Sequence, residues 1–353
     1  MFLAFFCGIQ IGPVFDAKGP RLLILSGGIL MVAAVLLMGI CTQYWHFMLT
    51  IGILAGIGTS LIFTPAVSSI GHFFLVKRGS ATGLAATGGS IGGIVFPLML
   101  QRLFPRIGWA WSTRVLALIF FVLCIISVLL VRSRLPPKPG SSVLPDLRIY
   151  RQPAFTFTTI AVFFMEWGLF VPITYIISFV VSTGIAAPDS SFPFAVLAVM
   201  NAGSSLGRYL PGVFADHIGR FNAMILAFGL CAITSLALWL PATVIHSSSP
   251  AIKPLVIIYA VLFGFASGSN ISLTPVCVGQ LCKTSEYGRY YATCYTLVAF
   301  GTLTGIPLAG ALLQVCNGSF IGVVLFTGGC YVMGLVSLIM ARRSKVGFTL
   351  VKY

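Results

Sequence analysis

Long apolar segments recur along the whole of this chain, and each is close to the roughly 20 residues that an α-helix needs to cross a bilayer. Because 58% of the residues are hydrophobic and only 8% are charged, too little polar surface is available to cover a soluble core of this size. We therefore expect an all-helical, multi-pass membrane protein. The spans are predicted at 22–41, 46–70, 80–103, 110–131, 154–183, 191–213, 221–245, 254–279, 289–314 and 319–341, after a shorter apolar run at 2–14.

The basic residues are distributed unevenly between the connections. Of the 21 Lys and Arg residues, four lie in or near one set of alternate connections (Arg102, Arg106, Arg114 and Lys253), and the other 17 lie in or near the opposite set. Such an excess of positive charge marks the cytoplasmic side of a membrane protein, so the C-terminal tail is predicted to be cytoplasmic. The net charge of +15 therefore reflects orientation in a membrane and does not indicate a nucleic-acid partner.

A short acidic motif occurs twice. Its first copy begins at the end of the first apolar run, and its second copy begins at the end of the span at 191–213. The residues are Gly12, Asp16, Gly19 and Arg21, then Gly212, Asp216, Gly219 and Arg220. This motif resembles the signature loop of the major facilitator superfamily, which joins the second helix to the third and the eighth to the ninth. Two copies in register are much stronger evidence than one.

A second segment narrows the resemblance. After the aromatic pair Phe73-Phe74, the chain has a basic pair, Lys77-Arg78, and then an Ala-x-Gly-x-Ala-x-x-Gly pattern that ends at Gly88. This order resembles the opening of the fifth helix in monocarboxylate-transporter-like facilitators, and it is closest to the fungal branch. Ser80 and Thr87 stand where that family usually has Leu and Ala.

The resemblance implies a fold of two six-helix bundles with the substrate bound between them near the membrane midplane. This chain would then lack the first helix and carry a clipped second one, which leaves about 11 spans. Residues 1–14 would rise only about 21 Å as a helix, against a hydrocarbon core of about 30 Å. A signal peptide is the alternative for this start, but it has no basic leader and no small-residue cleavage site.

The resemblance also guides where we expect the domain boundaries. We predict an incomplete N-terminal helical bundle over 1–131 and a C-terminal six-helix bundle over 153–341. Between them, the basic, Pro-rich segment 132–152 is predicted to be a cytoplasmic linker, because it has no means of burying itself. A cytoplasmic tail is expected over 342–353.

Arg208 lies inside a predicted span, where a charge costs at least about 2.5 kcal/mol on insertion scales. Its guanidinium offers a planar fork that matches a carboxylate. It resembles the eighth-helix arginine that holds the substrate carboxylate in monocarboxylate carriers. In those carriers an aspartate one turn earlier takes part in proton coupling, and here that position is Ser204. The alternative is an interfacial arginine that extends to lipid headgroups.

Glu166 is the other charged residue that stands out within a predicted span, because it lies near the middle of its helix. A carboxyl in a low-dielectric cavity can load and release a proton near neutral pH, and Glu166 could thus replace the missing aspartate. A permanently protonated carboxyl, or one bonded to a neighbouring hydroxyl, is the alternative. Four further polar residues could line the substrate path or make interhelical hydrogen bonds: Asn201, Tyr175, Asn270 and Tyr295.

The acidic motifs have a predicted gating role. Asp16 and Asp216 can cap the N-termini of neighbouring helices and pair with Arg21 and Arg220, holding one conformation until the bundles move apart. In the family this loop stabilises the outward-facing state. A simple turn with solvated charges is the alternative.

Taken together, these features predict a secondary transporter that moves a small, monocarboxylate-like organic anion by alternating access, with proton coupling open. The alternatives are a secondary-metabolite exporter, a neutral-solute permease and a non-transporting truncated paralogue. No catalytic, metal-binding or cofactor-binding set is recognised, so neither an enzyme nor a cofactor is expected. The expected partners are the substrate, protons and membrane lipids, and a monomer in the plasma membrane is the default.

Overall fold

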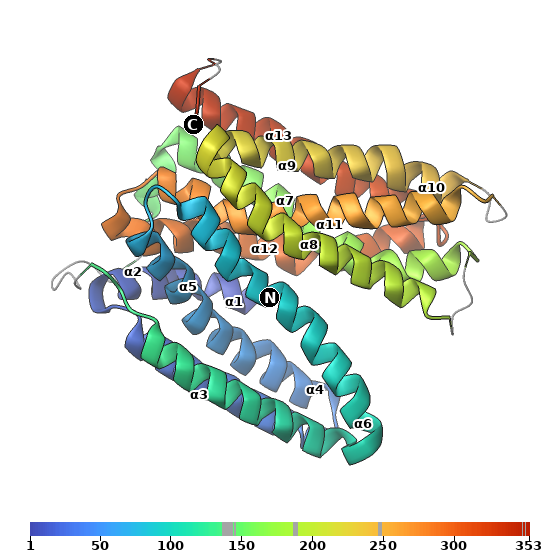
Figure 1. Ribbon diagram of the computed structural model, residues 1–353, viewed down its shortest axis with the longest axis horizontal. Helices are drawn as coiled ribbons and strands as arrows, with labels where there is room; N and C mark the ends of the chain where they lie inside the picture. The colour runs from blue at the N-terminus through green and yellow to red at the C-terminus, as the bar shows by residue number, and fades with distance from the viewer. Residues whose placement is uncertain (136–143, 145, 186–189, 246–248, 348, 350) are drawn as a thin grey trace. The chain divides into compact units, whose positions relative to one another are not determined.

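The structure is a computed structural model, and it describes residues 1–135, 144, 146–185, 190–245, 249–347, 349 and 351–353. Over these residues the chain is helical and contains no β-strand (Figure 1). Eight helices are long and apolar enough to cross a membrane, by length and composition. The expected all-α membrane fold is therefore confirmed.

The longer helices match the predicted spans closely. They are α3 (Arg21–Met38), α5 (Ala55–Phe73), α6 (Arg78–Leu130), α7 (Pro153–Ser182), α8 (Phe192–Ile218), α9 (Arg220–Thr234), α11 (Ile252–Gln280), α12 (Tyr287–Val315) and α13 (Ile321–Val346). The shorter ones are α1 (Phe2–Phe6), α2 (Gly8–Lys18), α4 (Tyr44–Phe47), α10 (Leu240–Val244), the π-helical turns Met48–Leu54 and Ser235–Trp239, and the 3₁₀ turns Leu147–Arg151 and Thr284–Glu286.

The long helix α6 contains two predicted spans. Gly108 interrupts it with φ 74° and ψ 176°, which are not helical angles. Directly after this break, the indole Nε1 of Trp109 donates a hydrogen bond to the carbonyl oxygen of Met38 at 3.0 Å. The segments predicted at 80–103 and 110–131 are thus separate helical pieces joined at Gly108.

The acidic motifs are more helical than the sequence predicted. The resemblance to a signature loop predicts that each motif forms a connection between two helices, but α2 continues to Lys18 and α8 continues to Ile218. The turn itself is confined to Gly19 and Gly219, whose φ angles are 82° and 102°. Glycine adopts such positive φ values without steric cost, and the helices therefore end at these two residues.

The chain forms two compact units by its contacts, and each gathers segments from both halves of the sequence. Unit 1 consists of 1–75, 95–150 and 278–299, and unit 2 of 76–94, 151–277 and 300–353. The division into bundles 1–131 and 153–341 remains a prediction. In the predicted linker 132–152, residues 136–143 and 145 lie outside the described residues.

In unit 1, α3 packs against α5, where a Cβ on Gly27 would lie 2.9 Å from the carbonyl oxygen of Gly58. Only 28% of the most apolar window of α3 is buried. Many of its large apolar side chains are exposed, among them Leu22 and Ile29. In a membrane protein such side chains face lipid.

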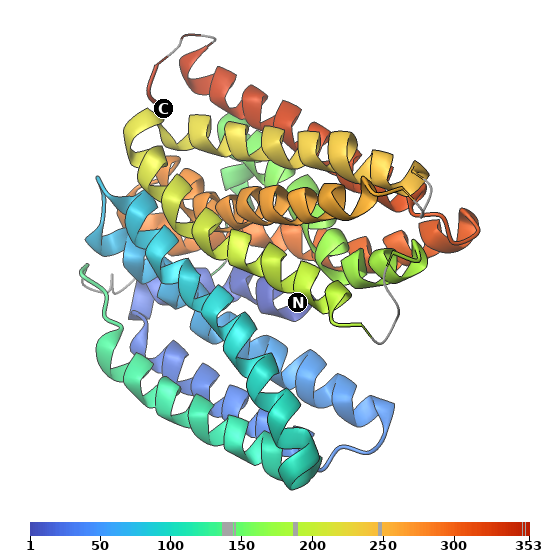
Figure 2. The same ribbon diagram turned by 45° about the vertical axis from the view of Figure 1, so that its right-hand side comes forward.

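Unit 2 has a more extensive interior. Helix α13 packs against α7 and α9, and α9 and α13 lie side by side in both views (Figures 1 and 2). Aromatic rings fill the space between helices: Trp239 stacks on Tyr259 with centroids 5.1 Å apart, and Tyr259 stacks on Phe263 at 5.3 Å. In the most apolar window of α11, 61% is buried.

Candidate functional site

Asp16, in the last turn of α2, caps the start of α12 within unit 1. Its Oδ1 accepts a hydrogen bond from the backbone nitrogen of Gly288 at 3.1 Å, and its Oδ2 accepts one from that of Arg289 at 2.9 Å. The first N–H groups of a helix have no partner inside the helix, and the helix dipole adds positive potential there. A carboxylate satisfies both demands.

Asp216, in the last turn of α8, makes the equivalent contact within unit 2. Its Oδ1 accepts from the backbone nitrogen of Gly79 at 3.0 Å, at the start of α6. Its Oδ2 accepts from the backbone nitrogen of Ser80 at 2.9 Å and from the Ser80 hydroxyl at 2.7 Å. The two copies of the motif therefore place their carboxylates on two helix N-termini.

The glycine four residues before each aspartate allows the close approach. A Cβ on Gly12 would overlap the carbonyl oxygen of Gly288, and one on Gly212 would overlap that of Gly79. Residues four apart share one face of a helix, so the glycine and the aspartate meet the same partner. This contact explains the Gly-x-x-x-Asp spacing physically.

The protonation of Asp16 is sensitive to its surroundings. Burial raises the pKa of Asp16 to about 7. The N–H bonds from Arg289 and Gly288 and the charge of Arg289 lower the pKa, whereas the carboxylate of Glu286 raises it. Arg21, the motif's own arginine, is exposed, and no ion pair among the described residues joins it to Asp16.

Arg208 lies in α8, two turns before Asp216, and packs against the first part of α6 within unit 2. Its Nη1 donates a hydrogen bond to the carbonyl oxygen of Ala86 at 2.7 Å. Its Nε is buried and has no hydrogen-bond partner among the described residues. A Cβ on Gly89 would lie 2.6 Å from Nη1, so the glycine makes room for the guanidinium.

Glu166 lies in the interior of unit 2, on α7. It is 4% exposed, and its Oε2 has no hydrogen-bond partner among the described residues. A buried, unpaired carboxylate is costly, which favours the neutral acid at this position. Within the described residues, no hydrogen bond or ion pair joins Glu166 to Arg208.

The four other candidates occupy separate surroundings. The Tyr175 hydroxyl donates to the carbonyl oxygen of Ile306 at 3.3 Å, and the Asn270 amide donates to Cys231 Sγ at 3.3 Å. Asn201 is half-buried on α8. It lies seven residues before Arg208, and this spacing puts both residues on the same face of the helix. Tyr295 belongs to unit 1.

Tyr295 takes part in an aromatic cluster. Its ring lies 4.9 Å from that of Phe5 and 4.7 Å from that of Tyr291. Only 4% of Tyr295 is exposed. These contacts fit an aromatic packing role in unit 1.

Sequence reasoning missed several contacts around the second motif. Ser80 had stood out only as a departure from the related pattern, yet its hydroxyl binds Asp216. The C-terminal tail also reaches this motif: the backbone nitrogen of Phe221 donates to the carbonyl oxygen of Tyr353 at 2.9 Å, and the two rings stack at 5.1 Å. In addition, Lys352 Nζ donates to the Asp216 carbonyl oxygen. No spacing in the sequence indicates that the tail folds back in this way.

A family profile described as the Major Facilitator Superfamily matches residues 1–252. The chain belongs to this superfamily. It is therefore a multi-pass membrane transporter, and the predicted superfamily is confirmed. The prediction that it is not an enzyme is also confirmed, because the relatives described below are transporters.

Three relatives illustrate the range of the superfamily around this facilitator. An MFS-type transporter of Gibberella moniliformis is 34% identical over 343 residues, covering 97% of this chain and 80% of the relative. The riboflavin transporter MCH5 of Saccharomyces cerevisiae is 33% identical over 366 residues (97% and 68%). The fujikurins efflux protein of Gibberella fujikuroi is 33% identical over 346 residues (97% and 72%).

A solved structure supports the same fold. The crystal structure of the human organic anion transporter MFSD10 superposes on this facilitator with a TM-score of 0.76. The match covers 96% of this chain and 81% of the other, at 16% identity. At this identity the likeness shows the fold alone.

Proposed function

We propose that this facilitator moves a small organic anion across the membrane by alternating access, and that Arg208 binds the anionic group. The proposal depends on the few hydrogen-bond partners that the Arg208 guanidinium has. It makes one hydrogen bond, to the Ala86 carbonyl oxygen, and its buried Nε has no partner among the described residues.

An arginine in this position needs a compensating group. A guanidinium has five N–H donors, and leaving them unpaired at membrane depth is costly. Among the described residues no carboxylate pairs with Arg208. The carboxylate of a substrate would supply both the negative charge and a matching pair of acceptors.

The two aspartate caps would serve as the latches of the transport cycle. Asp16 joins the start of the chain to α12, and Asp216 joins the second half of the chain to the start of α6. A rearrangement that separates these segments must break both pairs of hydrogen bonds. The caps would therefore stabilise one conformation of the cycle.

Glu166 is the proposed proton carrier, should transport be proton-coupled. It is a buried carboxyl with a free oxygen, but it makes no direct contact with Arg208. Coupling would then act through a conformational change. Asn201, Tyr175, Asn270 and Tyr295 are proposed to line or support the path.

A second candidate function is the export of a secondary metabolite or the movement of a neutral solute. It is favoured by the names of two relatives, the fujikurins efflux protein and the riboflavin transporter. For either candidate we propose a monomer in the plasma membrane, with the C-terminal tail in the cytoplasm.

Uptake into proteoliposomes separates the candidates. We expect saturable uptake of labelled lactate that falls at least about tenfold in Arg208→Gln, since one lost charge-assisted contact is worth about 1.5–3 kcal/mol. Arg102→Gln, an exposed arginine on α6, serves as the control. Lactate uptake that is unchanged in Arg208→Gln would refute the role of this arginine, and uptake of riboflavin without lactate would establish the second candidate.

Proton coupling has its own readout. An inwardly directed proton gradient should accelerate lactate uptake in the unaltered protein and leave the rate unchanged in Glu166→Gln. If the gradient accelerates both proteins equally, Glu166 is not the proton carrier.

A further inference from the structure

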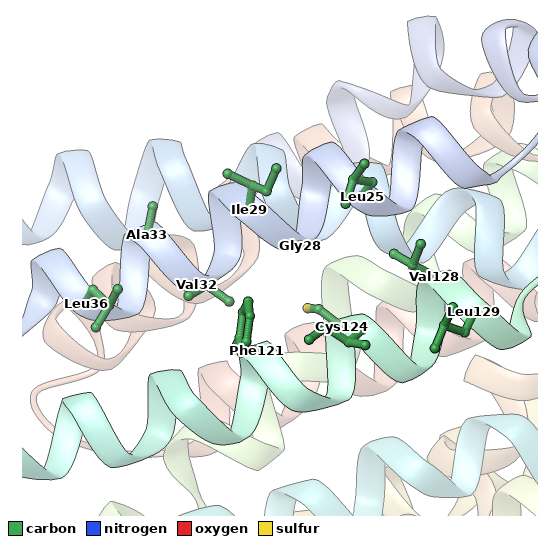
Figure 3. A pocket seen from close by; sticks show the side chains of 11 residues that line it. Leu25, Gly28, Ile29, Val32, Ala33, Leu36, Phe121, Cys124, Val128 and Leu129 are labelled. Atoms are coloured by element: carbon green, nitrogen blue, oxygen red, sulfur yellow. The ribbon is translucent and has the colours of Figure 1, made fainter.

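An apolar groove runs along the outer surface of unit 1, between α3 and the last part of α6 (Figure 3). Its volume is about 410 Å³, which lies in the range of small-ligand pockets, roughly 300–1,000 Å³. The lining consists of hydrocarbon side chains and one thiol: Leu25, Gly28, Ile29, Val32, Ala33, Leu36, Phe121, Cys124, Ile125, Val128 and Leu129.

The shape of the groove follows from the sizes of these side chains. A Cβ on Gly28 would lie 3.1 Å from Cys124 Cβ, so the two helices are close at these small residues, which form the floor. Larger side chains form the rims on both sides, and among them Ile29 and Leu129 are 62% and 63% exposed. The groove is therefore open along its outer face.

The length of the groove fits one half of a bilayer. Leu25 and Leu36 mark its two ends on α3, and eleven residues of helix rise about 16 Å. Half of the hydrocarbon core of a bilayer is about 15 Å thick. A hydrocarbon chain from a single leaflet would thus run the length of the groove.

Three arginines gather at one end of the groove, whereas the other end, near Gly39 and Thr113, has exposed Arg114 beside it. Figure 3 shows Leu25 opposite Val128 and Leu129 at the end with the three arginines. Arg21 lies one helical turn before Leu25, and Arg132 and Arg134 follow within a few residues of Leu129. All three arginines are exposed, and none has a carboxylate partner among the described residues.

We propose that this groove is a binding site for an anionic phospholipid. One acyl chain occupies the apolar channel between α3 and α6, and the phosphate meets the arginines beside Leu25 and Leu129. The positive-inside distribution places these arginines at the cytoplasmic leaflet. A neutral lipid would fill the channel equally well but would leave the arginines unpaired, so the charge selects the headgroup.

Native mass spectrometry of the purified full chain tests the site, with phosphatidylserine and phosphatidylcholine present in equal amounts. We expect phosphatidylserine to be retained preferentially. The double variant Arg132→Gln/Arg134→Gln should weaken its retention by about 25-fold, since each of the two arginines near a lipid surface contributes about a factor of five. The matched control is Arg102→Gln/Arg106→Gln, which removes two exposed arginines elsewhere on α6.

Filling the channel tests the acyl-chain half of the proposal. Ala33→Phe and, independently, Ile29→Trp should reduce the retention of both lipids, whereas Leu22→Phe, on the exposed surface of α3 outside the lining, should not. Ile29 is largely exposed, so its variant is expected to fold even if Ala33→Phe does not. Equal retention of the two lipids by the unaltered protein would overturn the proposal, as would full retention by a folded Ile29→Trp variant.

Discussion

Ser80 donates two hydrogen bonds to Asp216, one from its backbone nitrogen at 2.9 Å and one from its hydroxyl at 2.7 Å. The first helical turn of α6 is thereby tied to the last turn of α8. Both of these hydrogen bonds are accepted by the same carboxylate oxygen, Oδ2. The other oxygen, Oδ1, accepts a hydrogen bond from the backbone nitrogen of Gly79. Removing the carboxylate would leave all three donors without this acceptor.

We therefore predict that Asp216→Ala lowers the free energy of unfolding by about 0.5–2 kcal/mol, the usual range for a lost helix cap. Ser80→Ala should cost less, because the backbone bonds remain. Since the two residues share a network, the double variant should be less destabilised than the sum of the single variants. Thermal unfolding in detergent measures this, and strict additivity would contradict the prediction.

The contact between Asp16 and α12 should depend on pH. The pKa of Asp16 is about 7 in this arrangement, against about 4 for an exposed aspartate. The buried carboxyl binds its proton more tightly, so the contact gains stability as the pH falls from about 7 to about 4 and loses it as the pH rises through 7. The charges of Arg289 and Glu286 also act on this carboxyl, and they shift the pKa of Asp16 in opposite directions.

Hydrogen–deuterium exchange at Gly288 and Arg289 provides the measurement. After correction for the intrinsic rates, exchange should be several-fold slower at pH 6 than at pH 8. Asp16→Asn keeps an acceptor but cannot titrate, and it should show no such difference. A pH dependence that persists in this variant would assign the effect to another group.

Two neighbouring glycines should differ in their importance for transport. A methyl group on Gly89 would meet Arg208 Nη1 at 2.6 Å, whereas one on Gly88 would have nothing within 4 Å. Gly89→Ala should displace the guanidinium and raise the KM for an anionic substrate by about tenfold, the effect of losing one charge-assisted hydrogen bond. Gly88→Ala should leave the KM unchanged. Equal effects of both variants would exclude a specific role for this contact.

Substitution by alanine should change the stability of the protein in opposite directions at two further glycines. Gly219 has φ 102°, where an L side chain is strained, and a Cβ there would meet the Tyr353 backbone nitrogen. Gly219→Ala should therefore destabilise the protein by about 1 kcal/mol or more. Gly229 lies inside α9 with open space around it, and Gly229→Ala should stabilise by about 0.5–1 kcal/mol. Melting temperatures that move in the same direction would contradict this account.

The helices could be predicted from the sequence because the apolar segments have the length that a bilayer demands. The gap predicted between the spans at 80–103 and 110–131 also contains the observed break at Gly108. The sequence could not show how far α2 and α8 continue, because the glycines and prolines at Gly12, Pro13, Pro211 and Gly212 indicate a loop and yet are tolerated in these helices. Only the positive φ of the later glycines ends them.

The candidate site was predictable in part. The sequence singles out Asp16, Asp216 and Arg208 as charges in unusual places. It does not show which helices the aspartates cap, because those contacts join residues more than 130 positions apart. Nor does it distinguish Gly88 from Gly89, which share a small-residue pattern but face different surroundings.

The return of the chain end to the second acidic motif bears on how this transporter is best handled. Tyr353 stacks on Phe221, and Lys352 bonds to the Asp216 carbonyl oxygen. A fluorescent reporter fused directly after Tyr353 would be anchored beside the turn at Gly219, between α8 and α9, where its bulk would compete with these contacts. A long, soluble spacer before the reporter would keep the tail in place, and an antibody against the free tail would recognise only molecules in which it has detached.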